Sequence, residues 1–476
     1  MAVLAIDQGT SGTKAIVVSD DGAVLGIGEE PVRPTYLHGG GVEQDPAELL
    51  SSVITAGHRA IAAAGRPVTA ISIANQGETV LVWDPETGTP LSPAVVWQDR
   101  RAEMFCRNKS GDGDWVRERT GLVLDSYFSA PKMHWLRHNA TTAGVVTTSD
   151  TWLVHHLTGE FVTDAATASR SLLTDLDTMS WDQRLLDLFE LSDERLPSIV
   201  ANDAIVGETD AFGPTALVGG LIVDQQAALL AQRCLEPGTA KCTFGTGVFL
   251  LANVGATGVR PTSGLTCSVA WKLRDAGAYC IDGQCYTAAS AIRWIQDLGL
   301  ITAPGDLDVV AADDSGGAYF VPALAGLAAP WWRPDAAASF TGMTLSTNRS
   351  HLVAAVLEGL AAQTAELVSA IEGDLAAPLS TLRVDGGLTR SRRLMQATAD
   401  LTQMPVEVYP SSHATALGAA ACARMAADPS LSVRDAVDDW TATTTYHPRW
   451  PAERAADFRD HWRAAVTATL ARGEDR

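Results

Sequence analysis

The feature that most constrains the fold is a pair of similar turns set far apart in a chain of 476 residues. Residues 5–15 (AIDQGTSGTKA) place a turn of Gly and Thr between two β-prone runs, and residues 242–248 (CTFGTGV) repeat that arrangement. Such turns expose backbone N–H groups and hydroxyls that suit phosphate oxygens, while the carboxylate of Asp7 suits a hydrated Mg²⁺. Two copies predict two related halves that close on a nucleotide, a signature of phosphoryl transfer.

The residues around both turns predict an α/β protein in which strands alternate with helices. A hairpin meander opens the chain, and Asp45-Pro46 is a helix start signal. A second hairpin restarts the pattern in the second half. The predicted elements are strands at 3–7, 14–18, 24–27, 70–74, 79–83 and 382–385, a hairpin at 238–253, and helices at 47–64, 349–372, 391–401 and 414–427.

A chain of this length exceeds what one hydrophobic core supports, so two domains are expected. We place the boundary near Pro237-Gly238, which gives an N-terminal domain at 1–237 and a C-terminal domain at 238–443. Residues 444–476 combine Trp450, Phe458 and Trp462 with many charges. This composition predicts a C-terminal tail that packs as a helix on the surface.

Composition excludes several classes of protein. The formal net charge of −21 argues against nucleic acid and anionic membranes as partners, because their binding depends on Lys and Arg. Seven scattered cysteines without a Cys-x-x-Cys pair indicate buried thiols in a reducing, cytoplasmic setting. No signal peptide is expected, and the apolar run 318–332 is too short to span a bilayer, which takes about 20 residues. The histidines show no metal-ligand spacing, so we interpret them as packing or surface residues.

Motifs stand in order along residues 3 to 425, at 7–10 (DQGT), 75–79 (NQGET), 96–101 (VWQDRR), 121–129 (GLVLDSYFS), 150–153 (DTWL), 224–228 (DQQAA), 244–247 (FGTG) and 384–387 (VDGG). Together they resemble the FGGY carbohydrate kinases, and within them the glycerol kinases most closely. The resemblance implies two RNase H-like domains of the actin, hexokinase and 70-kDa chaperone type, with ATP in the cleft between them. It also implies a homo-oligomer, a dimer or a tetramer.

The resemblance assigns ATP and Mg²⁺ to the two turns and to the glycines of the last motif. Asp7 is the implied metal ligand, and Ser391 stands where the family has an Asn that contacts the base. An isolated Gly-Thr-Gly is more often an ordinary hairpin turn, but the pairing of two copies favours the functional interpretation. The implied nucleotide-binding residues are Thr10, Ser11, Gly245, Thr246, Gly247, Gly386, Gly387 and Ser391.

Asp224 is the candidate general base. It stands where a strand-like run meets a helix-like run, a place where Asp is also a common helix N-cap. The resemblance favours catalysis, in which this carboxylate accepts the proton of the attacking hydroxyl. The implied substrate-binding residues are Glu78, Asp224 and Gln225 for hydroxyl groups, and Trp97, Tyr127 and Tyr286 for the C–H face.

Gly77 departs from the glycerol kinases, which have an Arg here that binds substrate hydroxyls. With Gly in this place the site lacks the five N–H donors and the positive charge of that Arg, which should change substrate choice or affinity. Either a longer polyol or sugar fills the gap, or another residue replaces the Arg. The Gly-Gln-Met-His typical of xylulokinases is absent at this turn, so the expected substrate is a small polyol.

Three functions compete. The first is an ATP-dependent kinase of a small polyol, and the second is an FGGY kinase for a ketose such as xylulose or for another sugar or sugar acid. The third is a non-catalytic nucleotide-binding protein of the actin-like fold, since fold alone does not fix function. Asp224 favours an enzyme, because a module that only binds needs no base.

Overall fold

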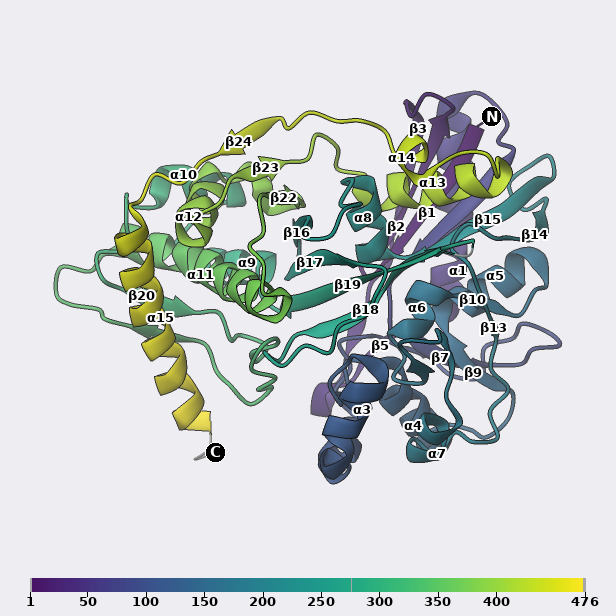
Figure 1. Cartoon of the computed structure of the whole chain (residues 1–476), viewed down its shortest axis with the longest axis horizontal. Helices are drawn as coiled ribbons and strands as arrows, with labels where there is room; N and C mark the ends of the chain where they lie inside the picture. The colour runs from purple at the N-terminus through teal and green to yellow at the C-terminus, as the bar shows by residue number, and fades with distance from the viewer. Residues whose placement is uncertain (1, 275, 474–476) are drawn as a thin grey trace.

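The computed structural model describes residues 2–274 and 276–473. Figure 1 shows two lobes, each organised around a sheet, with the N-terminus in one lobe and the C-terminal helix at the far end of the other. The observed architecture is the mixed α/β, two-lobed structure that the sequence predicts.

The first lobe is built on a sheet in the order β14-β15-β6-β1-β2-β3. Its first three strands in the chain form the predicted antiparallel meander, and β6 and β15 run parallel to β1. The strand bounds are β1 (Ala2–Gly9), β2 (Gly12–Ser19), β3 (Val24–Pro31), β6 (Ala70–Asn75), β14 (Ile205–Thr209) and β15 (Ala216–Val223).

The second lobe repeats this arrangement in a sheet of order β18-β19-β17-β16-β22-β23-β24. Here β16, β17 and β19 are antiparallel, while β22 and β23 run parallel to β16. The prediction of two related halves is therefore confirmed at the level of topology. The strand bounds are β16 (Ala240–Phe244), β17 (Val248–Gly255), β18 (Thr266–Leu273), β19 (Ala276–Cys285), β22 (Leu382–Asp385), β23 (Val406–Val408) and β24 (Thr444–Tyr446).

Helix α1 (Pro46–Ala64), which covers one face of the first sheet, forms for the local reasons that the sequence shows. The Asp45 carboxylate accepts a hydrogen bond from the Ala47 amide at 2.8 Å, and Pro46 occupies the first helical position. Gly65 ends the helix in the left-handed conformation, with φ 64°.

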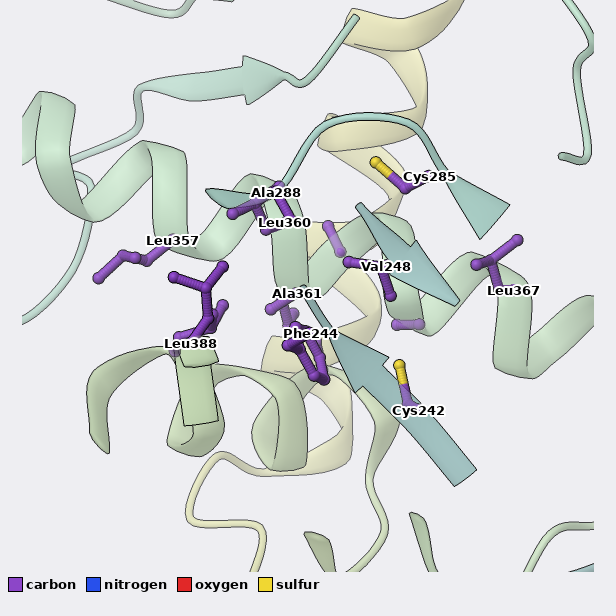
Figure 2. Packing of buried hydrophobic residues seen from close by; sticks show 14 of the residues in the cluster. Cys242, Phe244, Val248, Cys285, Ala288, Leu357, Leu360, Ala361, Leu367 and Leu388 are labelled. Carbon is purple, nitrogen blue, oxygen red and sulfur yellow. The ribbon is translucent and has the colours of Figure 1, made fainter. Parts of the chain in front are cut away.

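Helix α11 (Arg349–Leu375) is the central helix of the second lobe. Figure 2 shows Leu360 and Ala361 of this helix beside Phe244 and Val248 of the second sheet. By length and composition alone, α11 is the helix among the described residues that could cross a membrane, but 83% of its apolar window is buried inside the protein. Helix α11 is apolar because it forms part of the core of the second lobe.

Helix α13 (Ala414–Ala427) lies within the predicted C-terminal domain of 238–443 but contacts the first lobe. It follows the second sheet in the chain but packs on β1, β6 and β15 of the first lobe (Figure 1). Its small residues permit a close approach to α8 (Asp224–Ala231), since a Cβ at Gly418 would lie 1.9 Å from the carbonyl oxygen of Ala227. The chain therefore crosses between the lobes three times: before β16, before α13 and before β24.

The predicted tail helix is present as α15 (Ala452–Gly473). Trp462 is fully buried, and its indole N–H donates to the carbonyl of Phe320 at 2.8 Å. The helix is thus part of the second core rather than only a surface element.

A smaller sheet in the order β4-β5-β8-β7-β9, together with short helices, completes the first lobe beside the site. The remaining strands are β4 (Thr35–Tyr36), β5 (Val42–Gln44), β7 (Val80–Trp83), β8 (Ala94–Val95), β9 (Val145–Thr148), β10 (Val162–Asp164), β11 (Thr174–Asp175), β12 (Ser180–Trp181), β13 (Ser198–Val200), β20 (Tyr319–Val321) and β21 (Ser339–Thr341). The remaining helices are α2 (Glu103–Asn108), α3 (Gly113–Thr120), α4 (Ser129–Asn139), α5 (Ser149–Thr158), α6 (Ala165–Ser169), α7 (Gln183–Leu188), α9 (Ala289–Asp297), α10 (Leu307–Val310), α12 (Arg392–Thr402) and α14 (Val433–Ala436), with 3₁₀ turns η1 (His38–Gly40), η2 (Ser110–Asp112), η3 (Pro304–Asp306) and η4 (Gly387–Arg390).

Candidate active site

Both predicted turns border one cavity of about 250 Å³ between the lobes. The first turn reaches it from the β1–β2 connection and the second from the β16–β17 connection. Most of the predicted site residues line this cavity, so the two sequence halves meet at one place. The predicted residues in its wall are Thr10, Ser11, Glu78, Trp97, Tyr127, Asp224, Gln225, Gly245 and Thr246.

The charges of Asp224 and Asp385 act on Asp7 from different elements, and of these three residues Asp224 lines the cavity. Burial, and then the charge of Asp224, raise the pKa of Asp7 to about 7; Asp385 adds to this shift and Lys14 opposes it. Burial also raises the pKa values of Asp224 and Asp385, against the opposing charge of Lys241. A cation bound among these groups would relieve their mutual repulsion.

Asp224 does not cap its helix. Val223 is the N-cap of α8, and Asp224 is the first helical residue, with its carboxylate accepting from the amide of Gln225 at 2.7 Å. The Gln225 side chain accepts a hydrogen bond from the ammonium of Lys241. Asp224 therefore does not serve as the helix N-cap, and its carboxylate lines the cavity.

The acceptor side of the cavity combines a buried carboxylate with two aromatic rings. Glu78 is 4% exposed and has a positive φ of 60°, an uncommon conformation for a non-glycine residue. The rings of Trp97 and Tyr127 meet edge to face, with centroids 5.7 Å apart. The Trp97 indole N–H donates to the Thr10 hydroxyl at 2.9 Å, which ties the acceptor side to the first turn.

Tyr286 is not part of the cavity wall. Its ring lies beside that of Tyr127, with centroids 6.4 Å apart, and its hydroxyl is hydrogen-bonded by Arg100. Burial raises the pKa of Tyr286, and the Asp125 carboxylate adds to that shift. Tyr286 therefore supports Tyr127 from behind.

Glycines let the second turn and its neighbours approach closely. A Cβ at Gly247 would lie 2.4 Å from the carbonyl oxygen of Cys285, and one at Gly386, where φ is 95°, would lie 2.4 Å from that of Phe244. Gly245 and Gly387 have no such close neighbour, and Gly387 is exposed. The two glycine turns of the second lobe thus lie side by side, as parallel pairing of β16 with β22 requires.

The Ser391 hydroxyl is already hydrogen-bonded to other residues. It is the N-cap of α12, accepts from the amide of Leu394, and donates to Asp308 at 2.8 Å. Its predicted contact with a base stays a prediction, and the hydroxyl would have to leave these partners to make it.

The sequence interpretation missed Arg170, Asp282, Lys241 and Thr243. Arg170 and Asp282 line the acceptor side, and Thr243 donates to Asp385 at 2.6 Å beside the second turn. One local signal exists for Arg170, because it is the only charged residue in the run 165–174 (AATASRSLLT). A lone Arg among small and apolar residues predicts burial and therefore a carboxylate partner.

Gly77 leaves less space than its lack of a side chain suggests. A Cβ at this position would lie 2.8 Å from Cγ2 of Val223, and both residues line the cavity. Val223 therefore occupies the volume through which a longer side chain at position 77 would have to leave the backbone.

One group of histidines corrects the statement that none has metal-ligand spacing. His134 and His138 are four residues apart on α4, and with Glu190 they form a group that could hold a metal ion. Their rings are 4.0 Å apart, and the His138 side chain lies 3.1 Å from the Glu190 carboxylate. None of the three lines the cavity.

Comparison with known proteins covers nearly the whole chain. Residues 2–231 match the N-terminal domain of the FGGY family of carbohydrate kinases, and residues 240–427 match its C-terminal domain. The chain is 40% identical to a glycerol kinase from Bordetella parapertussis over 488 residues, which cover 98% of this chain and 96% of that protein.

Solved structures agree with this match. A glycerol kinase from Plasmodium falciparum with ADP superposes with a TM-score of 0.90 at 32% identity, covering 98% of each chain. A xyloylose kinase from Brucella ovis reaches a TM-score of 0.89 at 25% identity, covering 99% of this chain and 100% of that one.

Proposed function

Because this chain belongs to the FGGY family of carbohydrate kinases, which transfer a phosphoryl group to an alcohol, we propose that it phosphorylates a hydroxyl of a small polyol with ATP. Glycerol is the first acceptor to test, since a relative that is 40% identical is a glycerol kinase. The observation that carries the proposal is the single cavity in which Asp224 and Glu78 meet both Gly-Thr turns.

Asp224 serves as the general base. The acceptor oxygen forms a bond to the γ-phosphorus while the bond from that phosphorus to the β,γ-bridging oxygen breaks, and the hydroxyl proton passes to the Asp224 carboxylate. Burial raises the pKa of this carboxyl, which brings the base closer to neutral pH. In a loose transition state, positioning and charge stabilisation supply most of the acceleration, and the base supplies less.

The acceptor binds between hydrogen-bonding side chains on one side and aromatic rings on the other. Glu78 and Gln225 take hydroxyl groups, whereas Trp97 and Tyr127 cover the C–H face, with Tyr286 behind them. Edge-to-face packing and the bond from Trp97 to Thr10 hold these rings in place before substrate arrives. Such preorganisation lowers the entropy cost of binding.

The phosphates of ATP bind at the two turns through Thr10, Ser11, Gly245, Thr246 and Gly247. The hydroxyls of Ser11 and Thr246 have no hydrogen-bond partner within residues 2–274 and 276–473 and line the cavity. Gly386 and Gly387, with Ser391 after rearrangement, form the edge for the base.

The carboxylates near the first turn fit a magnesium ion. Asp7 is half-buried, and its pKa is raised by burial first and then by the charges of Asp224 and Asp385, against the opposing charge of Lys14. Carboxylate oxygens of this kind suit Mg²⁺. Bound there, the ion would supply charge neutralisation for the phosphates. We assign Asp7 as the residue that holds it.

Cellular setting and assembly belong to the same proposal. All seven cysteines are free and buried, which suits the reducing cytoplasm. We expect a dimer or a tetramer, and light scattering after size-exclusion chromatography would measure the mass directly.

A coupled assay of ADP release over a panel of acceptors tests the function. The panel contains glycerol, tetritols, pentitols, ketopentoses including xylulose, and sugar acids, each at matched concentration. The highest kcat/KM is expected for glycerol or another small polyol. A clear preference for xylulose would instead support the ketose kinase alternative, and ADP release that no acceptor stimulates would support a non-catalytic nucleotide-binding protein.

A further inference from the structure

The acceptor side contains a guanidinium that none of the matched motifs includes. Arg170 follows α6, is 5% exposed, and is the only Lys or Arg that lines the cavity within the described residues. The backbone before it is fixed, because the Asp164 carboxylate caps α6 through the Thr167 amide at 2.9 Å and is itself held by Asn202. The position of Arg170 is therefore set by the fold.

Arg170 joins the two lobes. Its Nε donates to the Glu78 carboxylate in the first lobe, and its Nη1 lies 3.2 Å from Asp282 and 3.3 Å from Ser268 in the second. Its hydrogen bonds within the described residues use only these two nitrogens. Nη2 thus remains as a donor for a ligand, next to the carboxylate of Glu78.

Position 77 cannot provide a guanidinium, and the structure shows which side chain lies against it. Cγ2 of Val223 lies where a side chain at Gly77 would begin, so this part of the wall is apolar. One of the two outcomes expected from the sequence, replacement by another residue, is thereby favoured over a larger pocket.

The charges of the wall also restrict the acceptor. The side chains lining the cavity that are ordinarily charged at neutral pH are Glu78, Arg170, Asp224 and Asp282. Three carboxylates surround one guanidinium, and two of them are already bonded to it. A carboxylate on the acceptor would face an excess of negative charge without a free cation.

We propose that Arg170 is the specificity-determining residue of the acceptor site and that, together with Glu78, it recognises a hydroxyl of a neutral polyol rather than a sugar acid. Glu78 accepts the hydroxyl proton in a hydrogen bond while Arg170 donates to the same oxygen. This inference rests on the proposed function but makes a separate claim about one residue.

The test combines variants of Arg170 with acceptors that lack one hydroxyl. Wild type, R170Q and R170K are assayed with glycerol, 1,2-propanediol and 1,3-propanediol, and glycerol binding is measured by calorimetry with a non-hydrolysable ATP analogue. R137Q and R137K are matched controls, because the Arg137 side chain is only 8% exposed and is paired with Glu194 but does not line the cavity. Thermal melting of every variant reports folding.

If Arg170 reads a hydroxyl, R170Q raises the KM for glycerol by about tenfold or more while the KM for ATP changes little. In R170Q the preference for glycerol over the propanediol that lacks the recognised hydroxyl also disappears. Once the guanidinium is absent, removing the hydroxyl as well costs little further binding energy. R170K, which keeps the charge without the planar fork, falls between. The Arg137 variants keep wild-type selectivity.

Unchanged hydroxyl selectivity in a folded R170Q or R170K overturns the assignment, and so does efficient turnover of glycerate or gluconate by the wild type. Failure of the proposed function looks different. In that case the wild type releases no ADP with any acceptor, and the calorimetric comparison of glycerol binding still decides the role of Arg170.

Discussion

Asp224 is the residue on which the proposed chemistry depends most directly. Replacing it by Asn keeps the shape and the hydrogen bond from the Gln225 amide but removes the proton acceptor. We expect D224N to lower kcat by about 100-fold or more while ATP binding and the melting temperature stay near wild type. Steady-state ADP release at saturating acceptor measures the effect, and near-normal turnover would remove Asp224 from the role of base.

Gly77 and Val223 form the second test at this scale. A methyl group at position 77 would meet Val223 at 2.8 Å, so G77A should destabilise the fold by about 1–2 kcal/mol through overpacking. In the double variant G77A/V223A the smaller side chain makes room, and the coupling between the two changes should favour the fold by about 1 kcal/mol. Urea unfolding of wild type, G77A, V223A and G77A/V223A gives the double-mutant cycle. If the two changes in the free energy of unfolding were strictly additive, position 77 and Val223 would not be in contact.

Among the elements, α11 carries a buried acid in an otherwise apolar core. Burial raises the pKa of Glu358 from 4.5 to about 7, and its Oε2 atom has no hydrogen-bond partner among the described residues. Between these two pH values the folded protein holds a proton that the unfolded chain has lost. Stability contributed by this group is present below pH 4.5 and is lost as the pH rises through 7.

The neutral variant E358Q should therefore be more stable than wild type at pH 8, by about 2–3 kcal/mol, and should show little gain at pH 4.5. Urea unfolding at both pH values measures the difference. E366Q on the same helix is the matched control, because Glu366 pairs with Arg459 at 3.1 Å and Arg463 at 2.8 Å. Removing the charge of Glu366 should destabilise the protein at pH 8. If E358Q and E366Q changed the free energy of unfolding equally at this pH, burial of Glu358 would not explain its effect.

The elements also show what the sequence could reveal. Helix α1 begins and ends where Asp45-Pro46 and Gly65 predict, because capping is local chemistry. The two Gly-Thr turns were also recognisable from the sequence, because each is set by a short run of neighbouring residues. Arg170 and Asp282 lie 112 positions apart in the chain and meet only after both sheets have formed. No local pattern could predict that contact, nor could it predict that Ser391 would be occupied by Asp308.

At the scale of the whole molecule, the lobes are joined across the cleft by side chains that also line the acceptor site. Arg170 bonds Glu78 on one side and Asp282 on the other. We expect acceptor and an ATP analogue together to favour a more compact state, since closure excludes water from the reacting groups. Small-angle scattering measures this as a decrease in radius of gyration.

The analogue alone and the acceptor alone are the controls for that experiment. Each should compact the protein less than the pair does, because only the pair fills both sides of the cavity. An unchanged radius of gyration with both ligands at saturation would contradict closure driven by substrate.

Helix α13 has a consequence for how the protein is made. Val3, Ala5, Ile16, Val18 and Ala70 of the first sheet share one apolar cluster with three alanines of this helix, Ala416, Ala420 and Ala423. A growing chain therefore displays that face of its first sheet to water until residues 414–427 have left the ribosome. The N-terminal half is the first to be synthesised but among the last to be finished, and a chaperone that covers this face would have the whole of that interval in which to act.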